Sequence, residues 1–125
     1  MKFLIILTLF ACVILSVLTI SLKWHHFDGA AKTCSNWKIA GNKLTGYCKN
    51  TLYHAQDETI DIDTCIGNNN GSFADGTNAS KTCSNLHIEG NLLKGSCKNA
   101  QGQDHQAQVD LNIIFANIHG ALKCR

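Results

Sequence analysis

The chain of 125 residues has no proline, few aromatic residues (7%) and few charged residues (16%). Its 11 basic and 9 acidic residues nearly balance, and the aromatic residues are not interleaved with the basic ones. Proteins that bind nucleic acid usually present a basic face, often with aromatic side chains that stack on bases. The composition therefore argues against nucleic acid as a partner.

Motifs of common enzymes and metal sites are also missing. No Cys-x-x-Cys pair occurs and the histidines are scattered, which disfavours a zinc site. There is no nucleophile motif, and nothing pairs two opposed carboxyl groups as glycoside hydrolysis requires. We therefore expect no enzyme activity, no metal and no cofactor.

A long apolar run lies at the amino end. Lys2 is followed by residues 3–22, which are almost all apolar, as in a secretory signal peptide. The run is also about long enough to span a bilayer, so an uncleaved signal anchor is the alternative. We expect residues 1–22 to be removed, leaving a secreted, extracellular domain over residues 23–125 without stable membrane insertion.

One stretch of the chain occurs twice. "KTCSNWKIAGNKLTGYCKN" begins at Lys32 and "KTCSNLHIEGNLLKGSCKN" begins at Lys81, so the offset is 49 residues. The offset continues without a gap, and repeat one covers residues 29–76 while repeat two covers residues 78–125. Two copies are too few for an open solenoid. We expect two units packed about a pseudo-twofold axis.

Each repeat has the pattern of β-structure. Trp37 and Ile39 alternate with polar or small residues, and the Gly41-Asn42 pair that follows predicts a tight hairpin. The segments "ETIDID" and "AQVDLN" alternate too, with aliphatic residues inward and acidic residues outward or anchoring turns. The run "NIIFANI" fits a helical turn or a buried strand, because it is too short for periodicity to decide.

Six cysteines remain after the apolar run, which contains Cys12. An even number in a short secreted chain predicts disulfides. The repeat allows local pairs or crossed pairs, and we favour the local pairs because each closes a hairpin: Cys34–Cys48 and Cys83–Cys97. Cys65 and Cys124 have no equivalent in the other repeat, so we expect them to pair with each other.

These segments resemble a known family. The motifs "TCSNWKIAGNKLTGYC", "IDID", "TCSNLHIEGNLLKGSC", "VDLN" and "NIHGALK" are similar to those of cyanovirin-N and its homologues over essentially the whole mature chain. The resemblance implies an all-β fold of two pseudo-symmetric halves, each a triple-stranded sheet plus a β-hairpin with short helical turns. Strand exchange would make each half draw on both repeats, in a monomer or a strand-swapped dimer. The family's members are lectins for high-mannose oligosaccharides, particularly terminal Manα1-2Man.

The resemblance also implies two sugar sites. Each would combine the segments that flank a local disulfide with a turn from the other repeat. The first site would contain Gly29, Lys32, Thr33, Lys49, Asn50, Thr51, Asn117 and His119. The second site would contain Asn68, Asn70, Thr77, Asn78, Lys81, Thr82, Lys98 and Asn99.

The chain departs from the family pattern within these sites. Lys49 stands where the family has an acidic residue, and His119 and Asn70 replace the aspartate of the turn. Since a carboxylate accepts hydrogen bonds more strongly than a neutral group, these changes favour an alternative. The alternative is a secreted, disulfide-stabilised structural or protein-interaction module of the same fold without sugar binding.

Several of these residues also have other expected roles. Asn70-Gly71-Ser72 and Asn78-Ala79-Ser80 are N-glycosylation acceptors, and a glycan at either would crowd the second site. Asn68 and Asn117 have a structural alternative to sugar contact, because asparagine often bonds the backbone of its own turn. Trp37 and Phe73 are expected in the core rather than as sugar platforms.

Overall fold

The computed structural model describes residues 29–52 and 54–125. The expected signal peptide lies outside the described residues. Within them, no helix has the length and apolar character needed to cross a membrane. The described strands form four antiparallel sheets, two with three strands and two with two strands.

The two three-stranded sheets are equivalent parts of the two repeats. One contains β1 (Cys34–Ala40), β2 (Lys43–Lys49) and β3 (Ala55–Asp61) in that order, and the other contains β6 (Cys83–Glu89), β7 (Leu92–Lys98) and β8 (Asp104–Asp110). The two hairpins are β4 (Ile66–Asn69) with β5 (Ser72–Asp75), and β9 (Phe115–Ile118) with β10 (Ala121–Cys124). Four short helical turns connect them: η2 (Ala30–Lys32), η3 (Ile62–Thr64), η4 (Ala79–Lys81) and α2 (Leu111–Ile114).

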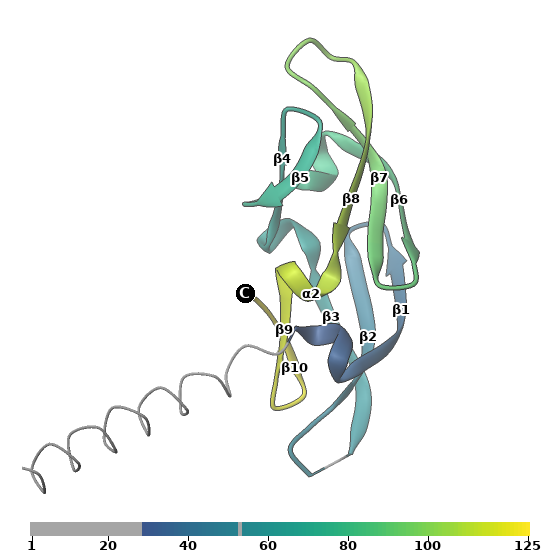
Figure 1. The fold of residues 1–125 in the computed structure, drawn as a ribbon, viewed down its shortest axis with the longest axis vertical. Coiled ribbons are helices and arrows are strands. Elements are labelled where there is room, and N and C mark those ends of the chain that lie inside the picture. Colours follow the sequence, from purple (N-terminus) through teal and green to yellow (C-terminus); the bar gives the residue numbers. More distant parts are fainter. Residues whose placement is uncertain (1–28, 53) are drawn as a thin grey trace, which may run out of the picture.

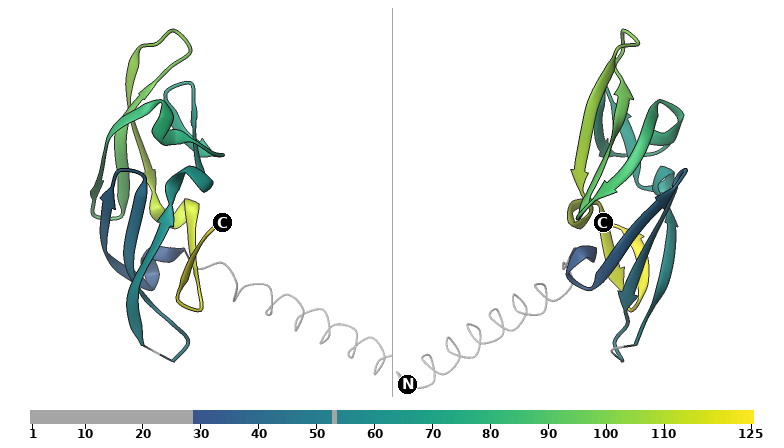
Figure 2. Two further views of the ribbon diagram at one scale, coloured as in Figure 1. Left: turned by 180° about the vertical axis from the view of Figure 1, so that it is seen from behind. Right: turned by 90° about the vertical axis from the view of Figure 1, so that its right-hand side faces the viewer.

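The hairpins are exchanged between the repeats, as expected. The β9–β10 hairpin of repeat two packs against β3 and η2 of repeat one, and Ala116 forms a β-bridge with Gly29. The β4–β5 hairpin of repeat one packs against β8 and η4 of repeat two. Figures 1 and 2 show the resulting halves end to end. We name η2, β1–β3 and β9–β10 the first half, and β4–β5, η4 and β6–β8 the second half.

The local disulfides are confirmed, because each joins residues that face each other in the strand register. Cys34 pairs with Cys48 between β1 and β2, and the Cα atoms are 4.1 Å apart. Cys83 and Cys97 have the same relation between β6 and β7, at 4.0 Å. Each hairpin is thus closed covalently at the end that carries the expected sugar contacts.

The third disulfide, Cys65–Cys124, is also confirmed. Cys65 directly precedes β4 of the second half, and Cys124 ends β10 of the first half. The bond therefore joins the two halves, with a Cα–Cα distance of 5.3 Å. Neither cysteine has an equivalent in the other repeat, so this link breaks the pseudo-symmetry.

The core is built from equivalent residues of the two repeats. The large, fully buried side chains are Leu44 and Leu93, Ile62 and Leu111, and Ile66 and Phe115. Trp37 and Phe73 pack against this core, as expected. The Trp37 ring covers Gly46, where an added Cβ would lie 2.5 Å from the ring. In the second half Leu86 and Phe73 share the equivalent space over Gly95.

One segment left open by its sequence is resolved, and one predicted alternation ends earlier than expected. The run "NIIFANI" forms a helical turn followed by a strand, since α2 ends at Ile114 and β9 begins at Phe115. The strand β3 ends at Asp61, and Ile62 begins a helical turn instead of extending the alternation. Asp61 and Asp110 act as turn anchors, because each side chain accepts a 2.9 Å hydrogen bond from the backbone N–H two residues on.

Candidate functional site

Asn117, near the tip of the β9–β10 hairpin, is the centre of the first site. Its Nδ2 donates to Thr33 Oγ1 at 2.9 Å and to the Lys49 carbonyl at 2.8 Å. Its Oδ1 accepts from the Gly120 N–H at 2.8 Å. One amide thus holds the hairpin tip from repeat two against both segments that flank the Cys34–Cys48 bond.

The segment after Cys48 is shaped by Asn50. Its Oδ1 accepts from the N–H groups of Leu52 (2.9 Å) and His54 (3.1 Å). A Cβ added at Gly120 would lie 3.1 Å from the Asn50 Cβ, so this loop packs directly beside the hairpin tip. Thr51 is exposed between them. Hydrogen bonds to Asn50 and Asn117 therefore hold the described backbone of the first site.

The second half repeats this arrangement. Asn68 Nδ2 donates to Thr82 Oγ1 and to the Lys98 carbonyl, both at 2.8 Å, and its Oδ1 accepts from the Gly71 N–H at 2.8 Å. Asn99 is the equivalent of Asn50, and its Oδ1 likewise accepts hydrogen bonds from two backbone N–H groups of its own loop. The structural role expected as the alternative for Asn68 and Asn117 is therefore present in both halves.

The sites differ at the hairpin tip. Asn70 Oδ1 accepts a 2.9 Å hydrogen bond from the Ala100 N–H, which ties the tip to the opposite loop of the second site. His119 occupies the equivalent position in the first half, with a similar left-handed backbone (φ 54° against 51°). Among the described residues no hydrogen bond joins His119 to Thr51, the equivalent of Ala100. The second site is therefore bridged by this bond, and the described residues of the first site form no equivalent bridge.

Some expected site residues lie elsewhere. Gly29 is buried, and a Cβ added there would lie 2.6 Å from the backbone oxygen and side chain of Asn112, so it is not exposed to a ligand. Thr77 and Asn78 lie at the start of η4, where the Asn78 N–H donates to the Asp63 carbonyl at 2.9 Å. No hydrogen bond of the described residues connects either of them to Asn68. Lys32 and Lys81 are exposed at the ends of η2 and η4.

The junction of the halves holds an acidic group with no equivalent in the other repeat. The Asp63 carboxylate accepts from the Ser80 N–H at 2.8 Å, from the Ser80 hydroxyl, and from Asn42 Nδ2 at 3.3 Å. Burial raises the pKa of Asp63, but the hydrogen bonds from Ser80 and Asn42 outweigh it, and the pKa lies below its ordinary value. In repeat two, Asn112 stands at the position of Asp63. It is neutral, and its Oδ1 accepts a hydrogen bond from the Ala31 N–H at 2.7 Å.

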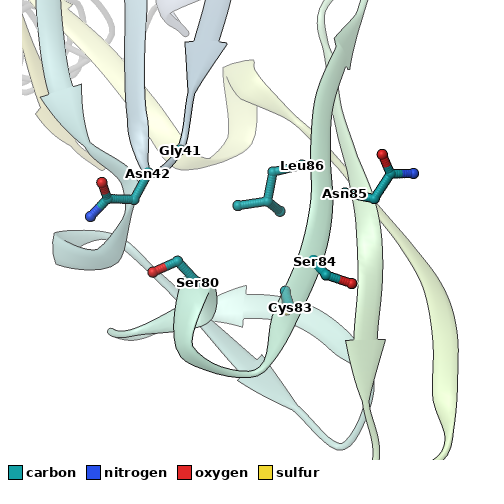
Figure 3. A pocket seen from close by; sticks show the side chains of 7 residues that line it. All are labelled: Gly41, Asn42, Ser80, Cys83, Ser84, Asn85 and Leu86. Carbon is teal, nitrogen blue, oxygen red and sulfur yellow. The ribbon is translucent and has the colours of Figure 1, made fainter.

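A hollow of about 460 Å³ also lies at this junction (Figure 3). Leu86 points into it, whereas the Asn85 side chain points away. Its lining comprises Gly41, Asn42, Ser80, Cys83, Ser84, Asn85 and Leu86. The hollow shares none of its residues with either sugar site, and its polar side chains Asn42 and Ser80 already bond acidic residues.

Sequence reasoning missed the residues that make the two sites unequal. Ala100 and Asp104 in the second site correspond to Thr51 and Ala55 in the first. The 49-residue offset would have revealed both differences if every pair had been compared. The hydrogen bond from Ala100 to Asn70 could not have been found in that way, because it depends on the exchanged hairpin.

Comparison with protein families identifies this architecture. The family model described as the CVNH domain matches residues 31–123. The chain belongs to the CVNH family. A search of curated proteins found no match.

Solved structures agree with this assignment. The CVNH protein of Gibberella zeae is 29% identical, with a TM-score of 0.68, and the match covers 76% of this chain and 95% of that one. A microvirin–mannobiose complex is 20% identical with a TM-score of 0.65, covering 78% and 99%. A MoCVNH3 variant in complex with (N-GlcNAc)4 is 12% identical with a TM-score of 0.73, covering 80% and 99%. The CVNH fold expected from the sequence is confirmed.

Proposed function

We propose that this CVNH protein is a secreted lectin that binds high-mannose oligosaccharides of the Manα1-2Man type. The observation that carries the proposal is the repeated surface around Asn117 and Asn68, where one amide orders two disulfide-flanked segments. Each exchanged sugar hydrogen bond gains little over water, so a lectin needs several donors and acceptors held ready. Two such surfaces on one chain would add avidity on clustered glycans.

Relatives of the same fold support a sugar ligand. Microvirin was solved with mannobiose, and a MoCVNH3 variant was solved with (N-GlcNAc)4. The two complexes contain different sugars on one scaffold. We take from them that the scaffold suits oligosaccharides, and we take the preference for mannose from the motifs of the sequence.

One observation favours the alternative module without sugar binding. Both Nδ2 protons of Asn117 and Asn68 are used within the protein, so neither amide has a donor left for a sugar. If the protein is a lectin, other side chains therefore bind the sugar, such as Thr51, Lys49 and His119 in the first site. A glycan array separates the two functions, since specific mannose spots support the lectin and a blank array at high protein concentration supports the module.

Glycosylation would act on the second site. Asn70 is exposed at the hairpin tip and bonds Ala100 through Oδ1, which leaves Nδ2 for a glycan between the two loops. Asn78 is exposed at the start of η4. We propose that material from a glycosylating host binds mannose through the first site. Calorimetry before and after enzymatic deglycosylation tests this, and equal stoichiometry in both states with the second site occupied would contradict it.

Secretion is part of the proposal and is tested separately. We expect mature protein in the medium to begin near Lys23, because the apolar run ends at residue 22. Amino-terminal sequencing of secreted material decides this. Recovery only in the membrane fraction, with the apolar run retained, would indicate a signal anchor instead.

A further inference from the structure

A lysine that forms no ion pair with the other described residues distinguishes the first site from the second. Lys49 ends β2 and faces Ala55 in the register of β3. Lys98 ends β7 in the same way, but it faces Asp104, and its Nζ lies 3.1 Å from the Asp104 carboxylate. Lys49 is exposed and forms no ion pair with any described residue. Within the described part of the chain, one of the two equivalent lysines is thus ion-paired and the other is not.

No acidic side chain in residues 29–52 and 54–125 forms an ion pair with Lys49. Asp57 is the nearest acidic residue along β3, but it faces Tyr47 in the register and forms no ion pair with Lys49. Across the site, His119 stands where the second half has Asn70, and His54 stands where it has Gln103. The first site thus has imidazoles at two positions where the second has amides, whereas Gln56 stands where the second half has His105.

We infer that the first site takes an oligosaccharide that carries an acidic group, such as a phosphate, a sulfate or a uronic carboxylate. The Lys49 carbonyl accepts from Asn117 Nδ2, so the residue belongs to the surface that the proposed function assigns to sugar, and its side chain is exposed there. An ammonium group donates up to three hydrogen bonds and suits an anion with several oxygens. The inference rests on the proposed carbohydrate binding and narrows its ligand class for this site.

The second site differs from the first in both its lysine and its hairpin tip. Its lysine is paired with Asp104, and its hairpin tip is tied to Ala100 through Asn70. An acidic sugar there would meet a carboxylate already bound to Lys98. We therefore expect the second site to show no preference between neutral and acidic sugars.

The test uses a substitution that copies the second half into the first. Ala55→Asp places a carboxylate opposite Lys49 in the register that joins Lys98 and Asp104. Ala55→Asn is the matched neutral control. Unglycosylated protein is titrated with Manα1-2Man, with phosphorylated, sulfated and uronic-acid-bearing mannobioses, and with inorganic phosphate. Shifts of the first-site backbone amides identify the site that responds.

We expect at least one acidic mannobiose to bind the unsubstituted first site about five- to tenfold more tightly than Manα1-2Man, the size of one charge-assisted hydrogen bond at an exposed surface. The preference should disappear in Ala55→Asp, persist in Ala55→Asn, and fall at about 1 M salt, where the Debye length is ~3 Å. Equal binding of neutral and acidic sugars overturns the inference but leaves the lectin intact. Binding of phosphate as tight as that of the acidic sugars also overturns it, and binding of no sugar contradicts the lectin itself.

Discussion

In both halves one asparagine at a hairpin tip holds the two segments that flank a disulfide. Asn117 does this in the first half and Asn68 in the second, with donor–acceptor distances that agree within 0.1 Å. The rims of the two sites nevertheless differ. The second is bridged by Asn70 and Ala100 and neutralised by Asp104, while the first has His119, Thr51 and Ala55 at those positions. The two repeats thus share the hydrogen-bonded scaffold of the sites, whereas the exposed residues around each site differ.

The largest effect is expected at the disulfide that the repeat does not duplicate. Replacing Cys65 and Cys124 by serine should lower the free energy of unfolding by about 4 kcal/mol, because the bond closes a loop of about 60 residues. The same change at Cys34 and Cys48, or at Cys83 and Cys97, should cost about 3 kcal/mol for loops of about 15 residues. Denaturant unfolding measures the free energy of unfolding of the three double variants. A smaller loss for the inter-half bond than for the local bonds would contradict the loop account.

The next largest effect tests whether the two asparagines at the hairpin tips stabilise their halves equally. Asn117→Ala and Asn68→Ala each remove three hydrogen bonds around one hairpin tip, and we expect a loss of about 2 kcal/mol for each. The two losses should agree within about 0.5 kcal/mol, since the bonds are equivalent. Thermal unfolding checks this against Asn69→Ala, which changes an exposed asparagine of the β4–β5 hairpin. A loss confined to one half would mean that the halves are not built alike.

A smaller effect distinguishes the turns at the junction of the halves. Asp63→Ala should cost about 1–2 kcal/mol, because it leaves the N–H and the hydroxyl of Ser80 without their acceptor. The pKa of Asp63 is lowered by these bonds, so their stabilisation is present at neutral pH and is lost as the pH falls through the lowered value. The difference between Asp63→Ala and the unsubstituted protein should therefore shrink in acid. Asn112→Ala, at the equivalent neutral position, should show no such pH dependence.

Much of the fold could be predicted because the repeat supplied two independent views of each element. The cysteine spacing indicated the local disulfides, and the leftover Cys65 and Cys124 indicated the third. The bulges in β1 and β6 were not predicted, although Asn36 and Asn85 both have a left-handed backbone (φ 53°). Asparagine tolerates that conformation better than most residues, but it occurs in many other settings, so the sequence alone does not single these positions out.

The sites were less predictable than the fold. The resemblance placed Asn117 and Asn68 among the sugar contacts, and the structure has their amides occupied by Thr33, Lys49, Thr82 and Lys98. Such contacts depend on hairpins exchanged between repeats, so residues more than 80 positions apart become neighbours, as Thr33 and Asn117 do. Local patterns carry no information on distances of that kind, and only the family motifs linked these segments in advance.

The central proposal is that, of two sites with the same scaffold, the first takes sugar more readily because only the second is bridged by Asn70 and Ala100. A nuclear magnetic resonance titration of unglycosylated, isotope-labelled protein with Manα1-2Man tests it most directly, because each backbone amide reports its own site. The account predicts early and saturable shifts at Thr51, His119 and Gly120, with the equivalent amides of Ala100, Asn70 and Gly71 shifting only at higher sugar concentration. Shifts that begin at Asn70 and Ala100, or that saturate equally in both halves, would contradict it.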